Sequence, residues 1–413
     1  MTPMSYDAFL KSEALVKLMI ENMPTENKAR ENFICRTFLL LMGLRGRYNF
    51  QNLARYGTYS EQTYRNNYQK EFDFKAFNLG LIRHSCSPHL LNAFDPSFIP
   101  KSGKHTPNLG RFWSGCAGKA LKGLEIGGFA VVDIENNTAL SLEAVATPSS
   151  HTLNEQGKTL VDHYAGIVLE RRQELESVSA YLAVDGYFAK VKFVDAVCQG
   201  SNLHLVGKLR SDADLRYLYQ GKYKGRGRPR LYEGKVDVKN IDSERLPICF
   251  KDQQVEIYSG LVYAKTLKRK VRIAYLHFLN EGKPTGKYQI LFSTDTELAG
   301  EWIYRYYKAR FQIEFLFRDA KQFTGLTHSQ ARSEQKLHFH FNAALTTVSL
   351  AKAAHYLPLS QKERKPFSMR EIKNLYLNKM ILDRFFTNFG LDPNMEINKT
   401  LIEKCLGYGN SAA

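Results

Sequence analysis

The chain has 413 residues, 44% of them hydrophobic, which is enough for two or three domains around a sizeable core. Lysine and arginine number 58 against 41 aspartate and glutamate residues, and this formal charge of +17 favours nucleic acid as a partner over a membrane surface or an acidic protein. No long apolar run, signal peptide or zinc-type cysteine pair occurs, so we expect a cytoplasmic protein without a membrane anchor, whose six cysteines are reduced.

The N-terminal region, residues 1–83, has helical periodicity and is predicted to form a helical domain. Within it, residues 49–56 and a second helix capped by Ser60 fit a helix-turn-helix with Gly57 at the turn. The second helix would present four polar side chains suited to reading bases or phosphates: Gln62, Arg65, Asn66 and Gln69. An ordinary helical hairpin with a polar outer face is the alternative interpretation.

Residues 84–210 change to strand patterns. Three apolar runs, at 89–95, 124–133 and 138–147, predict an antiparallel meander. A helix over about 159–176 follows, and a short apolar strand then leads directly into Asp185. This order is that of an RNase H-like α/β core, although other α+β folds share it.

Residues 211–296 carry further strand-type runs and are predicted to form a β-rich insertion. The segment GKYKGRGRPRLYEGK within it has an R-G-R-P core that resembles the AT-hook, a minor-groove-binding motif. Its arginines are therefore candidate DNA contacts: Arg226, Arg228 and Arg230. A solvated hairpin tip is the alternative.

Residues 297–355 would supply a long helix and the end of the core. After Gly300 the stretch through Phe323 lacks glycine and proline, and it is predicted to be one helix that Gly325 ends. Four polar side chains then share a face, within an arc of roughly 60°: Tyr307, Arg310, Glu314 and Lys321. Apolar side chains flank this stripe on both sides: Ile313, Leu316 and Phe317, and Phe311 and Phe315. The stripe is therefore predicted to face a cleft. Ordinary salt bridges would explain Arg310, Glu314 and Arg318, and Arg318 could pair with Glu314, but they would not explain the tyrosine or the lysine.

The spacing Y-x2-R-x3-E-x6-K resembles the signature of DDE transposases of bacterial insertion sequences, those related to Tn-five and Tn-ten. The resemblance covers roughly residues 92–352. It implies a nucleoid-associated enzyme that cuts double-stranded DNA at element ends and transfers the cut ends into target DNA by cut-and-paste transposition. Two alternatives stay open: an RNase H-like nuclease without strand transfer, and a domesticated DNA-binding protein without catalytic activity.

The resemblance implies three metal-binding carboxylates, and Glu314 matches the last of them. Asp185 resembles the second. Asp95, on the first strand and ahead of a basic loop, resembles the first, although Pro96 departs from the family pattern and leaves Asp133 as the alternative. Together Asp95, Asp185 and Glu314 would hold two Mg²⁺ ions, for which Mn²⁺ can substitute.

DNA contacts beside the metals are implied for Tyr307, Arg310 and Lys321, with Lys101, Lys104 and His105 in the basic loop as weaker candidates. The region 1–83 would bind the terminal inverted repeats. The helical region 356–413 would help a homodimer hold both ends in one synaptic complex. His338 and His340 point apart on a helix and are given no role.

Overall fold

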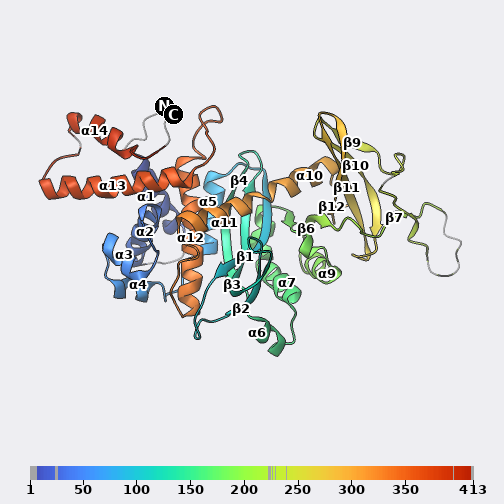
Figure 1. Ribbon diagram of the computed structural model, residues 1–413, viewed down its shortest axis with the longest axis horizontal. Helices are drawn as coiled ribbons and strands as arrows, with labels where there is room; N and C mark the ends of the chain where they lie inside the picture. The colour runs from blue at the N-terminus through green and yellow to red at the C-terminus, as the bar shows by residue number, and fades with distance from the viewer. Residues whose placement is uncertain are drawn as a thin grey trace. The chain divides into compact units, whose positions relative to one another are not determined.

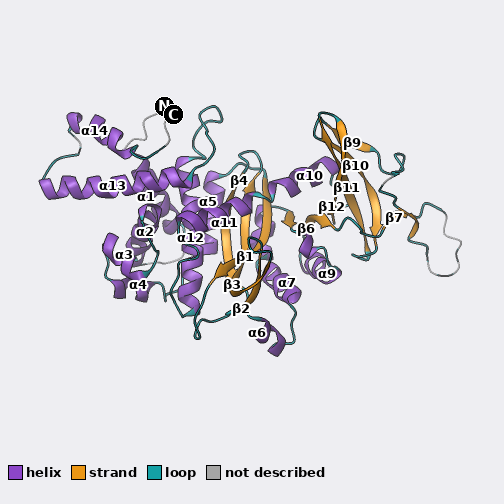
Figure 2. Ribbon diagram, viewed as in Figure 1, coloured by secondary structure: helices purple, strands orange, loops and turns teal. Residues whose placement is uncertain are grey.

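The computed structural model describes residues 7–23, 27–221, 225, 227, 229–238, 240–393 and 395–410, and it shows a mixed α/β protein (Figure 1, Figure 2). The chain divides into two compact units. The first contains Met1–Pro88, Pro96–Ser149 and Ile313–Ala413, and the second contains His89–Asp95 and Ser150–Gln312. Among the described residues, no helix has the length and apolar character needed to cross a membrane.

Five helices form the N-terminal part of the first unit: α1 (Asp7–Glu21), α2 (Lys28–Gly43), α3 (Phe50–Tyr56), α4 (Glu61–Asn67) and α5 (Phe74–Ser85). The predicted helix pair is confirmed, because Asn49 caps α3 and Ser60 caps α4. Gly57 joins them at a close approach, where an added Cβ would lie 2.7 Å from the Leu53 carbonyl oxygen. The turn between α3 and α4 therefore requires glycine.

The predicted meander is confirmed in the strands β1 (Leu90–Pro100), β3 (Lys119–Asp133) and β4 (Thr138–Ala146). β3 pairs antiparallel with β4, and the second half of β1, from Pro96, belongs to the first unit and runs beside β3. The predicted basic loop differs from the structure in two ways. β1 continues through Pro96 to Pro100, and a short strand, β2 (Gly110–Ser114), pairs antiparallel with the start of β3.

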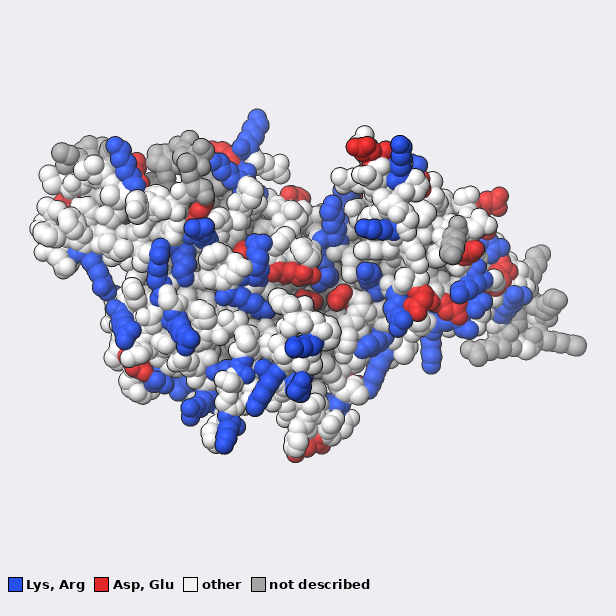
Figure 3. All heavy atoms as spheres, in the orientation of Figure 1, with Lys and Arg blue, Asp and Glu red and all other residues white. Residues whose placement is uncertain are grey.

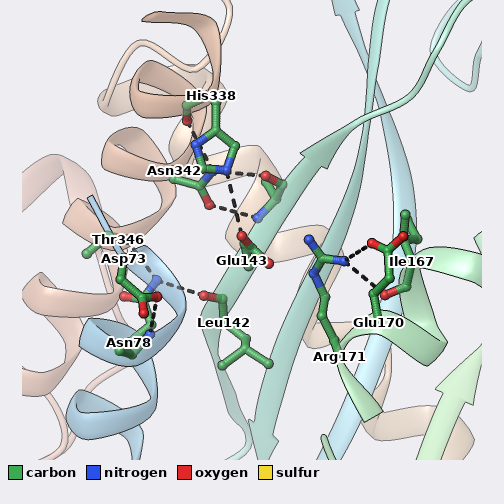
Figure 4. Close-up of polar contacts among 12 residues, drawn as sticks. Asp73, Asn78, Leu142, Glu143, Ile167, Glu170, Arg171, His338, Asn342 and Thr346 are labelled. Atoms are coloured by element: carbon green, nitrogen blue, oxygen red, sulfur yellow. Dashed lines mark hydrogen bonds and ion pairs between the residues drawn. The ribbon is translucent and has the colours of Figure 1, made fainter. Parts of the chain in front are cut away.

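Side chains of α12 (Glu334–His355) and α5 hold backbone groups of β4 (Figure 4). Asn342 accepts a hydrogen bond from the Ala144 amide at 2.7 Å and donates one to its carbonyl at 2.9 Å. Asn78 of α5 donates to the Leu142 carbonyl at 2.9 Å. These bonds use polar groups that an edge strand would otherwise leave open to pairing with another chain. Two further helices complete this unit: α13 (Met369–Phe389) and α14 (Glu396–Leu406).

The second unit begins with the first half of β1, which pairs in parallel with β5 (Tyr181–Val184); β5 pairs in parallel with β6 (His204–Leu209). The strands β4, β3 and β1 lie side by side, and two parallel strands are added beside β1, which is the order of an RNase H-like core, as predicted. The helices of this unit are α6 (Ser150–Glu155), α7 (Leu160–Glu170), α8 (Arg172–Val178), the short 3-10 helix η1 (Gly186–Phe188), α9 (Val191–Gly200) and α10 (Gly300–Ala309). The single helix predicted over 159–176 is thus two helices that meet at Arg171.

The β-rich segment predicted after β6 is confirmed. Its strands are β7 (Leu215–Leu218), β8 (Tyr232–Lys235), β9 (Ile248–Lys251), β10 (Val255–Ala264), β11 (Arg269–Asn280) and β12 (Lys283–Ser293). β12 pairs antiparallel with β6, and the hydrogen-bonded order continues β12-β11-β10-β7-β8, with β9 on β10. The insertion therefore extends the sheet of the core rather than forming a separate one.

Candidate active site

Two predicted carboxylates directly follow the last paired residues of the parallel strands β1 and β5. β1 and β5 pair in register, with Phe94 opposite Val184, and the next residue on each strand is Asp95 and Asp185. Neighbouring strands are about 4.8 Å apart. The register therefore places these two acids side by side where the pairing of β1 with β5 ends: Asp185 follows the last residue of β5, and Asp95 lies within β1, which continues to Pro100.

Buried contacts fix the two strand ends. The Phe94 ring packs edge-on against Tyr164 and Phe188, with ring centroids 5.7 and 5.3 Å away. Asn92, fully buried on β1, donates hydrogen bonds to the Leu175 and Ser179 carbonyls at 2.9 and 3.0 Å. A shift of either strand would break these packed contacts, so the spacing of the two acids is set by the core.

Asp185 directly follows β5, as predicted, and caps the 3-10 helix η1. Its Oδ1 accepts a hydrogen bond from the Gly186 amide at 2.6 Å. An added Cβ at Gly186 would lie 3.3 Å from the Lys208 carbonyl oxygen, so a larger residue there would be crowded. The backbone thus orients the carboxylate while leaving it only half-buried.

Arg310 contacts the first of these acids. Its Nη1 lies 3.5 Å from Asp95 Oδ1, and only 9% of the Arg310 side chain and 19% of the Asp95 side chain are exposed. The distance is long for a hydrogen bond, so the contact is chiefly an ion pair. The guanidinium carbon also lies 5.5 Å from the centre of the Tyr307 ring. Tyr307, Arg310 and Asp95 therefore form one contiguous group in the second unit.

The prediction of one helix from residue 297 to Phe323 is wrong. α10 ends at Ala309, and a second helix, α11 (Gln312–Phe323), begins after a turn at Arg310 and Phe311. The Arg310 amide donates to the carbonyl four residues back, at 3.0 Å, whereas the Phe311 amide donates to the carbonyl three residues back, at 3.3 Å. This tighter turn interrupts the regular α-helical rotation between α10 and α11. The four side chains predicted to share one arc therefore do not lie on one continuous helix.

Glu314 and Lys321 both lie on α11, in the first unit. They are seven residues apart, so they share a helix face to within about 20°. Ile313, Leu316 and Phe317 are buried beside them, as predicted, but Phe311 on the other predicted flank is 47% exposed. The polar stripe thus has a buried apolar flank on one side only.

Arg318, which the sequence offered as a partner for Glu314, pairs with its neighbour Asp319 at 3.0 Å. Asp319 is buried, with 4% exposure, whereas the Arg318 side chain is half exposed. The guanidinium also lies over the Phe315 ring, at 4.7 Å from its centre. Arg318 therefore neutralises a buried acid on α11.

Asp133, the alternative first acid, is fully buried in the turn between β3 and β4. Its carboxylate accepts hydrogen bonds from the Ser87 amide and hydroxyl at 2.8 and 2.7 Å, and from the Asn136 backbone and side-chain amides at 3.0 and 2.7 Å. Four short bonds occupy both oxygens. This geometry is that of a turn-forming residue, and it favours Asp95 as the first acid.

The predicted DNA contacts outside the catalytic segment have different surroundings. Lys101 donates to the Ser329 and Ala331 carbonyls at 2.5 and 3.2 Å, and burial lowers the pKa of its ammonium, whereas Lys104 is exposed. Arg65 on α4 is exposed and pairs with Glu61. Arg230 is exposed and lies 5.1 Å from the centre of the Tyr219 ring, while Arg226 and Arg228 lie outside the described residues.

The two histidines of α12 have separate surroundings. His340 is buried and lies 2.8 Å from the Gly325 carbonyl oxygen, and burial lowers its pKa to about 4. His338 lies 3.7 Å from a carboxylate oxygen of Glu143. His340 is therefore a neutral core residue at neutral pH, and the two rings do not act as a pair.

Among the described residues, no group of three or more His, Cys, Asp or Glu side chains is arranged to hold a metal ion. Asp95 and Asp185 nevertheless offer two carboxylates on adjacent strands, and carboxylate oxygens are the ligands that Mg²⁺ and Mn²⁺ prefer. The donor chemistry of this pair fits a divalent cation, which would compete with Arg310 for Asp95.

Comparison with known proteins gives a family match. A family model described as "Transposase DDE domain" matches residues 88–350. No curated protein matches the chain. A solved structure of a piggyBac transposase, in a synaptic complex with hairpin DNA, is similar at 12% identity, covering 98% of this chain and 84% of that chain, with a TM-score of 0.40. A likeness at this TM-score is weak, so the assignment depends on the family match.

Proposed function

Since the chain belongs to the DDE transposase family, whose members act in DNA transposition, we propose that it cuts the ends of an insertion sequence and transfers them into target DNA. The observation that carries this proposal is the pairing of β1 with β5, which sets Asp95 beside Asp185. Glu314 is proposed as the third acid because it matches the family motif. The reaction proposed is cut-and-paste transposition, in which phosphodiester hydrolysis precedes transesterification.

Metal binding is proposed for Asp95, Asp185 and Glu314. Two divalent ions held there would supply an activated water and would stabilise the leaving 3′ oxygen. The half-buried Asp185 and the mostly buried Asp95 provide hard oxygen ligands from a fixed backbone. The paired strands β1 and β5 restrict the freedom of these two ligands, which lowers the entropy lost when they bind.

Arg310 is proposed to exchange partners during this reaction. In the protein alone its guanidinium neutralises Asp95, and the Tyr307 ring supports it from one side. Once cations neutralise the carboxylate, the guanidinium can grip a DNA phosphate through two parallel hydrogen bonds. Lys321 is proposed as a further phosphate contact. This exchange keeps a buried positive charge paired at each stage.

End recognition is proposed for α4, with Arg65 as a contact to DNA. The excess of lysine and arginine supports binding to a polyanion, and Figure 3 shows these residues outnumbering acidic ones on the face drawn. Exposed Lys104 and Arg230 are proposed as further phosphate contacts. Lys101 is proposed chiefly to fix the loop after β1, because its ammonium already binds two carbonyls.

A homodimer is proposed to hold two element ends. On α13, three apolar side chains at i, i+4 and i+8 are exposed: Ile381 at 58%, Phe385 at 47% and Phe389 at 67%. A second copy fits such a face because two-fold pairing matches the stripe with itself. Phe385→Glu together with Phe389→Glu should shift the protein–DNA assembly from two chains to one in analytical ultracentrifugation. An unchanged assembly would exclude this face as the dimer contact.

The catalytic proposal is tested with Asp185→Asn and Glu314→Gln in a gel assay using Mg²⁺ and DNA that carries the element ends. Each variant should bind DNA normally and lose cleavage by at least about 100-fold, because loss of a residue that only supports a metal ligand already costs about 10- to 100-fold. Glu135→Gln, an exposed acid in the β3–β4 turn, is the matched control and should cut like the unmodified protein. Full cleavage by both variants would show that the acids are wrongly assigned.

An assay with pre-cut element ends distinguishes a transposase from the two alternatives, a nuclease and a non-catalytic DNA-binding protein. Joining of these ends to a target plasmid would exclude a nuclease without strand transfer. Binding without either cleavage or joining, by the unmodified protein, would indicate a domesticated DNA-binding protein. Terminal inverted repeats and short target duplications around the gene would support an insertion sequence.

A further inference from the structure

The hairpin of β2 and β3 presents one face made of basic and aromatic side chains. In its antiparallel register Arg111 lies opposite Lys122, and Trp113 lies opposite Ala120. Alternate residues of a strand point to the same side, and directly opposite residues share that side. Arg111, Trp113 and Lys122 therefore occupy a single face, which we call the hairpin face.

The opposite side of the hairpin anchors it to the first unit. Phe112 is buried, with 7% exposure, and an added Cβ at Gly123 would lie 2.6 Å from the Ile99 carbonyl oxygen on β1. By contrast, Trp113 is 65% exposed, and Arg111 and Lys122 are also exposed. The informative feature is the combination: a flat, exposed indole shares one anchored face with two basic side chains, which is the composition of a surface that stacks bases and binds phosphates.

The charged residues of the segment that contains this hairpin have one sign. Residues 96–124 contain no aspartate or glutamate but have five lysines and arginines: Lys101, Lys104, Arg111, Lys119 and Lys122. Like charges directly opposite on a strand pair repel each other. Arg111 donates a hydrogen bond to the Ala120 carbonyl on β3 at 3.1 Å. Because Ala120 lies opposite Trp113, this bond holds the guanidinium beside Trp113. In Figure 3, lysine and arginine gather over the lower part of the face, where Figure 1 labels β2 and β3.

We propose that the hairpin face is a DNA-binding platform on which Trp113 stacks against an unstacked base while Arg111 and Lys122 contact the flanking phosphates. Bases inside a duplex cover each other's faces, so a flat indole can stack only on an unpaired base or on the last pair of an exposed end. Aromatic stacking next to a basic groove is how proteins hold single strands. The proposal rests on the proposed function only in taking DNA as the ligand, and it involves none of the three carboxylates.

Tryptophan fluorescence gives a direct test, since the chain has two tryptophans. Trp302→Phe leaves Trp113 as the single reporter and keeps an aromatic ring where Trp302 contacts His89 and Tyr306. The full-length variant is titrated with a 16-nucleotide dT strand, a blunt duplex and a covalently closed circular duplex. Anisotropy of labelled DNA, or gel retardation for the circle, measures binding independently.

We expect the dT strand to quench Trp113 most strongly and the closed circle to leave it nearly unchanged at equal saturation. Quenching by the blunt duplex but not by dT would identify a terminal base pair as the source of the exposed base face. Unchanged fluorescence with all three DNAs at saturation would overturn the proposal, because the indole then touches no base.

Substitutions separate stacking from charge. Trp113→Ala should weaken dT binding by about tenfold or more, and Trp113→Phe should restore most of it. Arg111→Gln and Lys122→Gln should each lower the slope of log affinity against log salt by about 0.7, whereas the exposed Lys283→Gln on β12 is the matched control and should not. Thermal melting of Trp113→Ala should match that of the unmodified protein, since the side chain is exposed.

Two results distinguish this inference from the proposed function. Normal dT binding by Trp113→Ala, with cleavage still dependent on Asp185, would reject the platform and keep the transposase chemistry. Quenching of Trp113 in a protein that neither cuts nor joins DNA would reject the proposed catalytic activity and keep the platform.

Discussion

Arg310 places Nη1 3.5 Å from Oδ1 of Asp95, a residue 215 positions earlier in the chain. Both side chains are largely withdrawn from water, so the attraction between the two charges is only weakly screened. The cation proposed to bind Asp95 would compete with the guanidinium of Arg310 for the same carboxylate. This competition links the family motif on the α10–α11 segment to the first proposed metal ligand.

Arg310→Gln should consequently have opposite effects on metal and DNA binding. Without the competing guanidinium, the DNA-free protein should bind Mn²⁺ more tightly, as measured by calorimetry. Binding to element-end DNA should weaken, and the salt slope should fall by about 1, because one phosphate contact is lost. Glu314→Gln is the matched comparison and should keep DNA binding while abolishing cleavage. Weaker Mn²⁺ binding by Arg310→Gln would contradict the competition.

Asp133→Asn should affect folding rather than chemistry. The amide cannot accept all four hydrogen bonds that Ser87 and Asn136 donate, so at least one buried donor loses its partner. We expect the free energy of unfolding to fall by about 2 to 4 kcal/mol, measured by urea titration. Cleavage should persist at low temperature, where the variant is folded. A variant that is as stable as the unmodified protein but inactive would make Asp133 the metal ligand in place of Asp95.

The sequence predicted the elements whose signals are local. Gly57 marks the turn of the α3–α4 pair and Ser60 the cap of α4, as predicted, whereas Asn49, expected as the first helical residue, is the N-cap of α3. The strands β1, β3 and β4 were also predicted from local signals, because turn residues separate their apolar runs. Local rules sufficed where no distant contact opposed them.

The missed features depend on distant contacts. No glycine or proline marks the break at Arg310, whose side chain instead meets Asp95 from another part of the chain. β2 was missed because a five-residue strand that begins with glycine has little periodicity of its own, and its pairing with β3 defines it. Phe311 was expected to be buried because an uninterrupted helix would place it on an apolar flank. The regular helix ends before Phe311, at the C-cap Arg310, and Phe311 is exposed.

Lys352 should make stability depend on pH. Burial lowers the pKa of its ammonium from 10.5 to about 8, and the side chain donates to the Ala139 carbonyl at 2.8 Å. Between pH 8 and 10.5 the unfolded chain binds a proton at Lys352 that the folded chain lacks. The contribution of Lys352 to the free energy of unfolding therefore increases as pH rises through this range and decreases as pH falls.

Lys352→Met should remove that contribution. From pH 8 to pH 10 the unfolding free energy of the unmodified protein should gain on the order of 2 kcal/mol relative to the variant. Urea titrations of both proteins at several pH values measure the difference, so contributions from other groups, including the similarly shifted Lys373, cancel. A difference independent of pH over this range would show that Lys352 keeps an ordinary pKa in the folded protein.

The end of α11 should be sensitive to any side chain at Gly325. This residue has φ +74°, and an added Cβ would lie 2.3 Å from Cγ of the Tyr48 ring, which is buried. Tyr48 donates to the Phe323 carbonyl at 2.5 Å, and Lys373 donates to the same oxygen at 2.8 Å, so both hold the last turn of the helix that carries Glu314. Moving Tyr48 to admit a methyl group would disturb that turn.

Gly325→Ala is compared with Gly390→Ala to separate backbone strain from this clash. Gly390 ends α13 at φ +64° with nothing within 4 Å of an added Cβ, so its substitution should cost about 1 kcal/mol. Gly325→Ala meets the same backbone strain and the Tyr48 ring as well, and should cost about 3 kcal/mol or more in urea titrations. It should also slow DNA cleavage while folded, because Glu314 moves with α11. Equal losses of unfolding free energy in the two variants would mean that the Tyr48 ring moves aside without disturbing the end of α11.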